Sequence, residues 1–110
     1  MICRVLAQST VTDLNTAEGW YTRLFGTEPD ARPMPGLLEW HLGDSFGVQV
    51  WSEPDRAGQS TMVLEDTELD TTATRLSEQG IRHDAPQPGG GARILQLQDP
   101  DGNRIVLTGA

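Results

Sequence analysis

A chain of 110 residues has the size of one compact domain, and its 36% hydrophobic residues, 12 glycines and 7 prolines suit a turn-rich α/β protein and argue against a disordered chain. No apolar run approaches the ~20 residues that span a bilayer, so no membrane segment is expected. The net charge of −8 would repel phosphate backbones, which argues against nucleic-acid binding, and would attract a cationic partner.

Cysteine use points to a reducing compartment. The single cysteine, Cys3, excludes an intrachain disulfide and a cysteine-rich zinc site. The first residues have no basic region followed by a small-residue cleavage site, so they predict a first strand rather than a secretion signal. A cytoplasmic location is the resulting expectation.

The first half of the chain predicts a strand, a helix and two further strands. Strand-like residues run from Cys3 to Val11, and Asp13 is placed to cap a helix over 15–25. Gly26 would end that helix in a left-handed conformation. The predicted helix has one apolar stripe at helical spacing, formed by Ala17, Trp20, Tyr21 and Leu24. Strands are predicted at 37–42 and 48–51, joined by a turn at 43–47.

The second half repeats this order after a polar linker at about 52–58. The pattern predicts a strand at 60–64, a helix at 66–79 that ends at Gly80, and a loop at 86–91. Two more strands, at 93–98 and 104–108, are predicted around the turn Asp99-Pro100-Asp101-Gly102-Asn103. Each half therefore predicts a strand, a helix and then two or three strands.

Short sequence matches between the halves indicate an internal duplication. Thr22-Arg23-Leu24 recurs as Thr74-Arg75-Leu76, and Pro33 to Gly36 has a counterpart in Pro86 to Gly89, at nearly the same separation. We therefore predict a single domain over 1–110, with repeat one at about 1–53 and repeat two at about 59–110. One repeat is too small to bury a sheet face alone, so the two must pack together, within or between chains.

These motifs resemble those of the vicinal oxygen chelate (VOC) family, which includes glyoxalase I, extradiol dioxygenases and bleomycin-resistance proteins. The resemblance lies in Val11-Thr12-Asp13-Leu14, in the helix ending Trp20 to Gly26, in the Asp99 to Asn103 turn with Ile105 to Leu107, and in the duplication. It implies an α+β fold in which two βαβββ repeats form a cup-shaped mixed sheet with helices on the convex face. It is specific for the fold rather than for a function.

In the family's metal enzymes, ligands from the first and last strands of each repeat face the cup. Carried onto this chain, those positions fall at Leu6, Gln49, Thr61 or a neighbour, and Val106. Leucine and valine have no lone pair, and one glutamine cannot retain a divalent cation. We therefore expect no metal and no cofactor.

Strand alternation gives the expected lining of the cup. A neutral, amide-rich surface with an aromatic wall suits an organic ligand held by hydrogen bonds and stacking. Burial of these amides at a subunit interface is the alternative, and the two are compatible because family cups often lie between subunits. The predicted ligand-binding residues are Leu6, Gln8, Thr10, Gln49, Trp51, Gln96, Gln98 and Val106.

No catalytic residue is assigned. Glu39 and His41 share a strand face and could act as a base and its partner. The turn length does not fix whether this face lines the cup, and a solvated outer face is the favoured interpretation. His83 is interpreted as a solvated turn histidine.

The sequence thus predicts a metal-independent, homodimeric protein of the glyoxalase/bleomycin-resistance type that binds a small organic or antibiotic-like ligand. One alternative is a VOC-fold lyase, isomerase or dioxygenase with a displaced metal site or a metal-free Glu39/His41 site. Another alternative is a degenerate domain that acts only as an interaction module.

Overall fold

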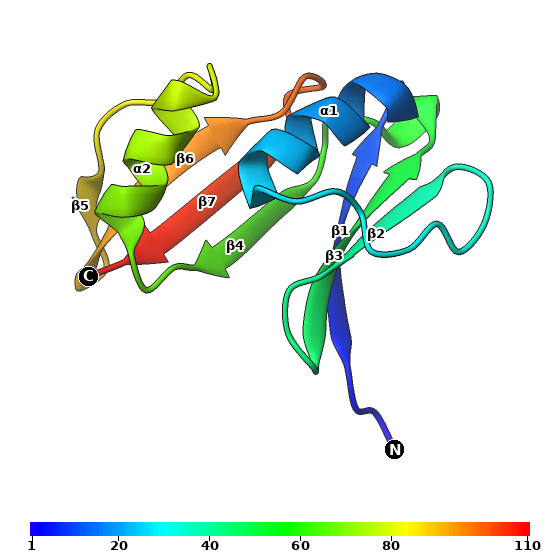
Figure 1. Ribbon diagram of the computed structural model, residues 1–110, viewed down its shortest axis with the longest axis horizontal. Coiled ribbons are helices and arrows are strands. Elements are labelled where there is room, and N and C mark those ends of the chain that lie inside the picture. Colours follow the sequence, from blue (N-terminus) through cyan, green and yellow to red (C-terminus); the bar gives the residue numbers. More distant parts are fainter.

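The computed structural model describes all 110 residues and contains two helices, seven strands and one short 3₁₀ turn (Figure 1). Both helices lie on the same side of the strands. The elements in chain order are β1 (Val5–Val11), α1 (Leu14–Phe25), β2 (Leu37–His41), β3 (Phe46–Ser52), η1 (Pro54–Arg56), β4 (Thr61–Glu65), α2 (Leu69–Glu78), β5 (Gln87–Gly89), β6 (Ala92–Gln98) and β7 (Arg104–Gly109). Neither helix has the length and hydropathy that crossing a membrane requires.

The strands form two sheets, one from each half of the chain. Sheet A has the order β1-β3-β2, with β1 parallel and β2 antiparallel to β3. Sheet B has the order β4-β7-β6-β5, with β4 parallel to β7 and the other pairs antiparallel. The position of β5 is taken in the first half by an isolated bridge between Ala31 and Glu39. The predicted fold class, α+β with two βαβββ-like units, is confirmed.

Helix α1 forms where its capping residues and apolar stripe predict it. The Asp13 carboxylate accepts a hydrogen bond from the Asn15 backbone N–H at 3.0 Å, which satisfies a donor that has no partner within the helix. Gly26 ends the helix with φ of 75°, and its N–H donates to the Thr22 carbonyl. All four residues of the predicted stripe are buried.

Helix α2 begins at Leu69, three residues after the predicted start at Asp66. The Asp66 N–H donates to the Thr108 carbonyl, so this residue stays paired with the end of β7. Its carboxylate accepts hydrogen bonds from the Glu68 N–H and the Thr72 hydroxyl, and thereby organises the turn before the helix. The predicted loop at 86–91 also contains the short strand β5, which the sequence interpretation missed.

The repeated Thr-Arg-Leu motif has equivalent roles in the two helices. The Arg75 guanidinium donates to the Arg23 and Leu24 carbonyls at the end of α1. In return, the Arg23 guanidinium donates to the Gln79 carbonyl at the end of α2, at 3.1 Å. Each arginine therefore donates hydrogen bonds to carbonyl groups at the C-terminal end of the other helix. These groups have no partner within their own helix, and the helix dipole there favours a cation.

A single hydrophobic core lies between the helices and both sheets. Side chains from α1, α2 and the helix-facing sides of six strands pack into one cluster. Around Tyr21, the rings of Trp20, Phe25 and Trp40 lie at centroid distances of 4.8 to 6.0 Å. Trp40 is fully buried, and its indole N–H donates to the Thr27 carbonyl.

The turn between β6 and β7 ties the two units together. The Asp99 carboxylate accepts hydrogen bonds from the Tyr21 hydroxyl at 2.8 Å and from the Asn103 side-chain amide at 2.7 Å. The same Asn103 NH₂ group also donates to the Thr10 carbonyl of β1. The Asn103 side-chain oxygen, Oδ1, accepts from the Ser60 N–H just before β4. The turn residues that carry the family resemblance are therefore structural.

Candidate functional site on the outer face of sheet A

One face of sheet A is turned away from the helices, and we call it the outer face of sheet A. Val11, Val48 and Leu38 belong to the core, so the residues that alternate with them point to the other side. The strand register aligns Gln8 with Gln49 and Gln49 with Glu39 in one row across the sheet. The outer face consists of Leu6, Gln8 and Thr10 on β1, Gly47, Gln49 and Trp51 on β3, and Leu37, Glu39 and His41 on β2.

The central row is a continuous hydrogen-bonded network. The Gln8 amide donates to the Gln49 carbonyl oxygen at 3.1 Å, and the Gln49 amide donates to Oε2 of Glu39 at 2.8 Å. Nε2 of His41 lies 2.7 Å from Oε1 of Glu39. Arg4, just before β1, places a guanidinium nitrogen 3.8 Å from the same oxygen.

Glu39 is the charged centre of this network. The residue is only 8% exposed, yet the hydrogen bond from Gln49, followed by the one from His41, lowers the pKa of its carboxyl below the ordinary value. Because these donors favour the charged form more than burial opposes it, Glu39 is a carboxylate at neutral pH.

The favoured interpretation of Glu39 and His41 as a solvated outer surface of the strand is wrong for Glu39, whereas His41 is exposed as expected. Glu39 is buried and aligned with Gln49, so the pair shares the face of the predicted ligand-binding residues. Asp44 lies in the hairpin turn, midway in sequence between Glu39 and Gln49. The Gly43 N–H closes this turn by donating to the Phe46 carbonyl. A turn centred on Asp44 would have predicted this pairing, and that was the signal missed.

The aromatic wall of the outer face is fixed in place. The Trp51 indole N–H donates to the Glu53 carboxylate at 2.9 Å. Its ring lies over Gly36, where an added Cβ would come within 3.3 Å of a ring carbon. A half-buried, oriented indole of this kind can stack on a planar ligand without the entropy cost of ordering a free side chain.

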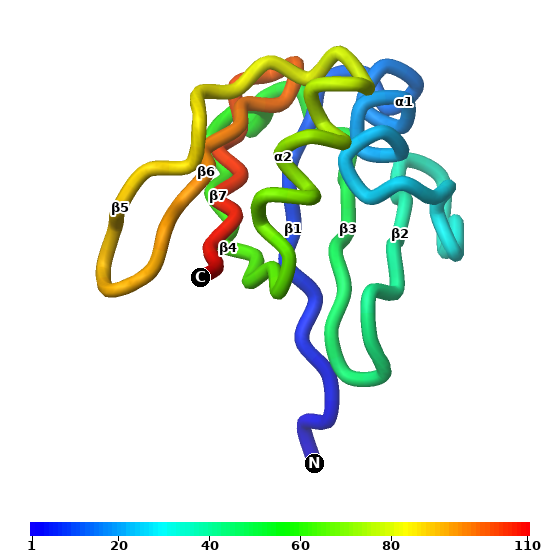
Figure 2. Tube along the Cα trace, turned by 60° about the vertical axis from the view of Figure 1, so that its left-hand side comes forward, coloured from blue at the N-terminus to red at the C-terminus, as the bar shows by residue number.

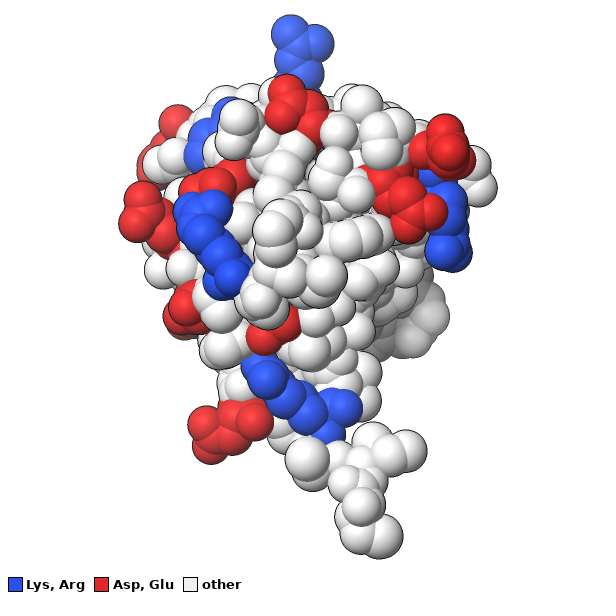
Figure 3. Space-filling view, turned by 90° about the vertical axis from the view of Figure 1, so that its right-hand side faces the viewer, with Lys and Arg blue, Asp and Glu red and all other residues white.

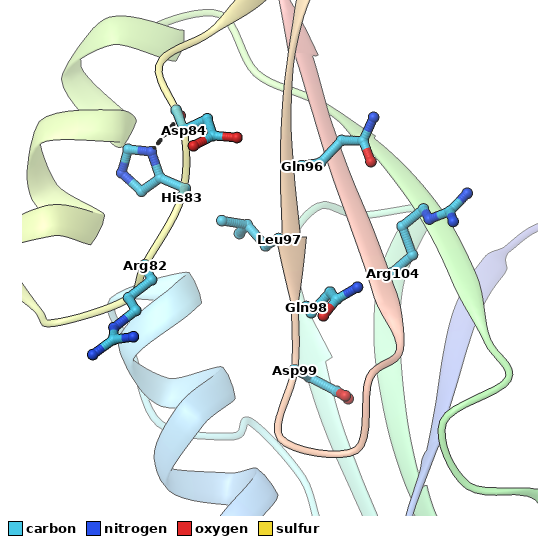
Figure 4. A pocket seen from close by; sticks show the side chains of 8 residues that line it. All are labelled: Arg82, His83, Asp84, Gln96, Leu97, Gln98, Asp99 and Arg104. Carbon is cyan, nitrogen blue, oxygen red and sulfur yellow. Dashed lines mark hydrogen bonds between the residues drawn. The ribbon is translucent and has the colours of Figure 1, made fainter.

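The other predicted ligand-binding residues lie on the corresponding face of sheet B. Gln96 pairs with Val106, and Gln98 pairs with Arg104. A cavity of about 560 Å³ runs beside this part of β6 (Figure 4). It includes Gln96 and Gln98 but no residue of sheet A. Its lining residues are Arg82, His83, Asp84, Gln96, Leu97, Gln98, Asp99 and Arg104.

His83, at the edge of this cavity, is held by the structure. Nδ1 lies 2.7 Å from the Asp84 carbonyl oxygen, and Nε2 lies 3.0 Å from both the Ser77 hydroxyl and the Ala73 carbonyl oxygen. The ring therefore attaches the loop after α2 to that helix, and a structural role accounts for its contacts.

The positions aligned with the family's metal ligands do not fit a metal. Leu6, Gln49, Thr61 and Val106 provide no carboxylate and no imidazole, and hard or borderline divalent cations require several such groups. Elsewhere in the chain, no three His, Cys, Asp or Glu side chains converge on one point. Glu39 and His41 are the nearest approach to a ligand set, and they are only two.

Figure 3 shows one side of the molecule. Its charged side chains lie mainly around the margin, and uncharged residues lie between them. Several exposed residues at the free ends of β1 and β3 are apolar. Val5 is 68% exposed and Phe46 is 54% exposed, because these strand ends extend beyond the helices (Figure 2). Val5 lies on the helix-facing side of β1, as Val11 does, but no helix covers it.

Solved structures of similar fold cover nearly the whole chain. A glyoxalase/bleomycin resistance protein from Catenulispora acidiphila has a TM-score of 0.90 and 27% identity, with 97% of each chain covered. The antibiotic-binding protein TnmS3 from Streptomyces sp. CB03234 has a TM-score of 0.80 and 25% identity, covering 96% of this chain and 93% of that one. A lactoylglutathione lyase from Agrobacterium tumefaciens has a TM-score of 0.79 at 18% identity, covering 96% and 92%.

No protein-family model matches the sequence, and no curated protein matches it significantly. The similarity is therefore carried by the three-dimensional structure, over 96–97% of this chain. The protein has the vicinal oxygen chelate fold that its sequence motifs predicted.

Proposed function

We propose that this protein is a metal-independent, cytoplasmic binding protein that sequesters a small organic, antibiotic-like molecule without chemical conversion. The observation that carries the proposal is the outer face of sheet A. There, hydrogen-bonding amides and an oriented tryptophan share one face with Leu6 and Gln49, two of the positions that the family resemblance aligns with metal ligands. Amides bind and orient a ligand but do not titrate, so most of this surface supports recognition rather than proton transfer.

The similar structures support the same class of function. One is described as a glyoxalase/bleomycin resistance protein and another as an antibiotic-binding protein, both at 25% identity or more. The net charge of −8 would favour a cationic molecule in its approach to this chain.

The proposed binding unit is a homodimer. The predicted ligand-binding residues are divided between the outer faces of two different sheets. A partner that placed its sheet B against the outer face of sheet A would join Gln96 and Val106 to Gln49 in one cup. The exposed apolar residue Val63, which pairs with Val106 on the same face of sheet B, favours burial in such a contact.

The binding proposal is tested by calorimetry with a panel of aromatic and cationic antibiotics, bleomycin among them, in buffer with and without EDTA. We expect saturable binding that EDTA does not change and an unmodified ligand by mass spectrometry afterwards. Gln49→Ala should weaken binding at least tenfold, whereas Gln79→Ala, on the helix side, should not. Stoichiometric metal in the purified protein, or turnover of the ligand, would overturn the proposal.

The dimer is tested by light scattering coupled to size exclusion. Val63→Glu should shift the protein to a monomer because it buries a charge in the contact between the two outer faces. Met34→Glu is the matched control, since Met34 is also exposed, at 53% against 64% for Val63, but lies in the loop before β2. A wild-type monomer at all concentrations would contradict the dimer while leaving the binding proposal open to calorimetry.

A second candidate is a metal-free acid–base enzyme. The observation that favours it is the 2.7 Å contact between His41 and a carboxylate that orients its ring, as in other acid–base pairs. His41→Ala would then abolish turnover of a bound ligand while leaving its affinity within a few fold.

A further inference from the structure

The charge on Glu39 fixes the direction of every hydrogen bond in the outer-face network. A carboxylate only accepts hydrogen bonds, so Gln49 must present its NH₂ group to Glu39 at 2.8 Å. This leaves the Gln49 carbonyl oxygen directed at Gln8, which must in turn donate through its own NH₂ group at 3.1 Å. The orientation of both amides follows from this chain of requirements.

Both ends of the network then present acceptors. With one N–H bonded to Gln49, Gln8 keeps a second N–H and a carbonyl oxygen that make no hydrogen bond within the protein, and this residue is exposed. At the other end, a neutral His41 that donates from Nε2 to Glu39 leaves Nδ1 with a free lone pair. Each oxygen of Glu39 has a single hydrogen-bond donor, so each retains capacity to accept another.

We propose that the outer face of sheet A selects ligands by their hydrogen-bond donors, and that its specific chemistry is recognition of a protonated amine, amidine or guanidinium group. This inference rests on the proposed binding function and names the class of ligand. An anionic acceptor would find only the free N–H of Gln8 as a donor, and it would be repelled by the charge of Glu39 at the centre of the network.

Arg4 shows how a cation approaches this network. Its guanidinium nitrogen lies 3.8 Å from Oε1 of Glu39, and the side chain remains 35% exposed. Arg4 precedes β1 and makes no side-chain hydrogen bond, so a ligand cation can displace it at small cost. Arg4 is thus an internal competitor for the carboxylate. Removing it should strengthen the binding of a cation.

The test uses two planar probes of similar shape, benzamidinium, a cationic donor, and benzoate, an anionic acceptor. Binding is followed by the side-chain NH₂ signals of Gln8 and Gln49 in ¹H–¹⁵N spectra at pH 7.5. We expect saturable shifts with benzamidinium and none with benzoate. Glu39→Gln should weaken benzamidinium at least tenfold, and Arg4→Gln should strengthen it severalfold.

Net charge is controlled by Glu78→Gln, a carboxylate on the exposed side of α2 that removes the same charge and should change affinity less than twofold. Equal losses in Glu39→Gln and Glu78→Gln, or equal binding of benzoate, would overturn the proposal. The absence of any benzamidinium shift would also overturn it. If antibiotics nevertheless bound by calorimetry, the binding function would stand and only the donor selectivity would fail. Arg4→Gln, at an exposed position, keeps the test decisive if Glu39→Gln does not fold.

Discussion

Removal of the Tyr21 hydroxyl tests the importance of the buried contact between α1 and the β6–β7 turn. Tyr21 is fully buried and Asp99 is 5% exposed, and their oxygens lie 2.8 Å apart. A hydrogen bond to a charged group contributes about 1.5–3 kcal/mol. Asn103 still donates to the same Asp99 oxygen after the change, which places Tyr21→Phe at the low end, about 1.5 kcal/mol.

Urea unfolding followed by tryptophan fluorescence measures this loss. With a slope of about 1.5 kcal/mol/M, the midpoint should fall by about 1 M while the slope stays unchanged. The melting temperature should fall by roughly 6 °C for a domain of this size. Asp99→Asn and the double variant complete a cycle, in which we expect a coupling of about 1 kcal/mol. A loss below about 0.5 kcal/mol, or simple additivity, would refute the reasoning that this contact joins the two units.

Three further predictions concern pH and the backbone. Burial, and next the Asp99 charge, raise the pKa of Tyr21 above its ordinary value of 10.0, so the folded state holds this proton more tightly and stability should fall as pH rises above about 10. Tyr21→Phe should remove that fall in urea midpoints measured from pH 9 to 11, and a chain with one tyrosine allows its ionisation to be followed by absorbance. The hydrogen bond from Gln49 is the chief reason that the pKa of Glu39 lies below 4.5. Its contribution to the free energy of unfolding is therefore present at neutral pH and is lost as the pH falls below 4.5. Glu39→Gln should therefore flatten the acid limb between about pH 5 and 3, and an unchanged limb would contradict the assignment. Gly58→Ala should cost at least about 2 kcal/mol, because φ is 84° and the added Cβ would lie 2.4 Å from the Asp101 carbonyl oxygen. Gly91→Ala, at φ of 82° with open space around it, should cost only about 1 kcal/mol in the same urea assay, and equal costs would show that the clash is absent.

Local signals in the sequence were enough to predict most elements. Asp13 and Gly26 fix the ends of α1 through contacts within a few residues of the chain, so a sequence pattern contains them in full. The period of two along a strand puts Leu95 and Leu97 on one face and Gln96 and Gln98 on the other, and both leucines are buried in the core. These interactions depend on the neighbouring backbone and little on the rest of the fold.

The features that the sequence did not reveal depend on partners far along the chain. Strand β5 has no apolar alternation, and it forms because Gln87 to Gly89 pair with β6 across a tight turn. The burial of Glu39 depends on the register of a hairpin and on the bridge to Ala31. A single residue of uncertainty in that turn reverses the face of every residue on β2.

The position of Asn103 has a consequence for how the protein unfolds. Its side chain makes hydrogen bonds to β1, to the segment before β4 and to Asp99. Separating the two halves would therefore leave several buried polar groups without hydrogen-bond partners. The halves should therefore melt in one cooperative step rather than as independent modules, despite their separate sheets. Native-state hydrogen exchange should find the Ser60 amide, in a connecting segment where fast exchange is usual, protected to the full global free energy.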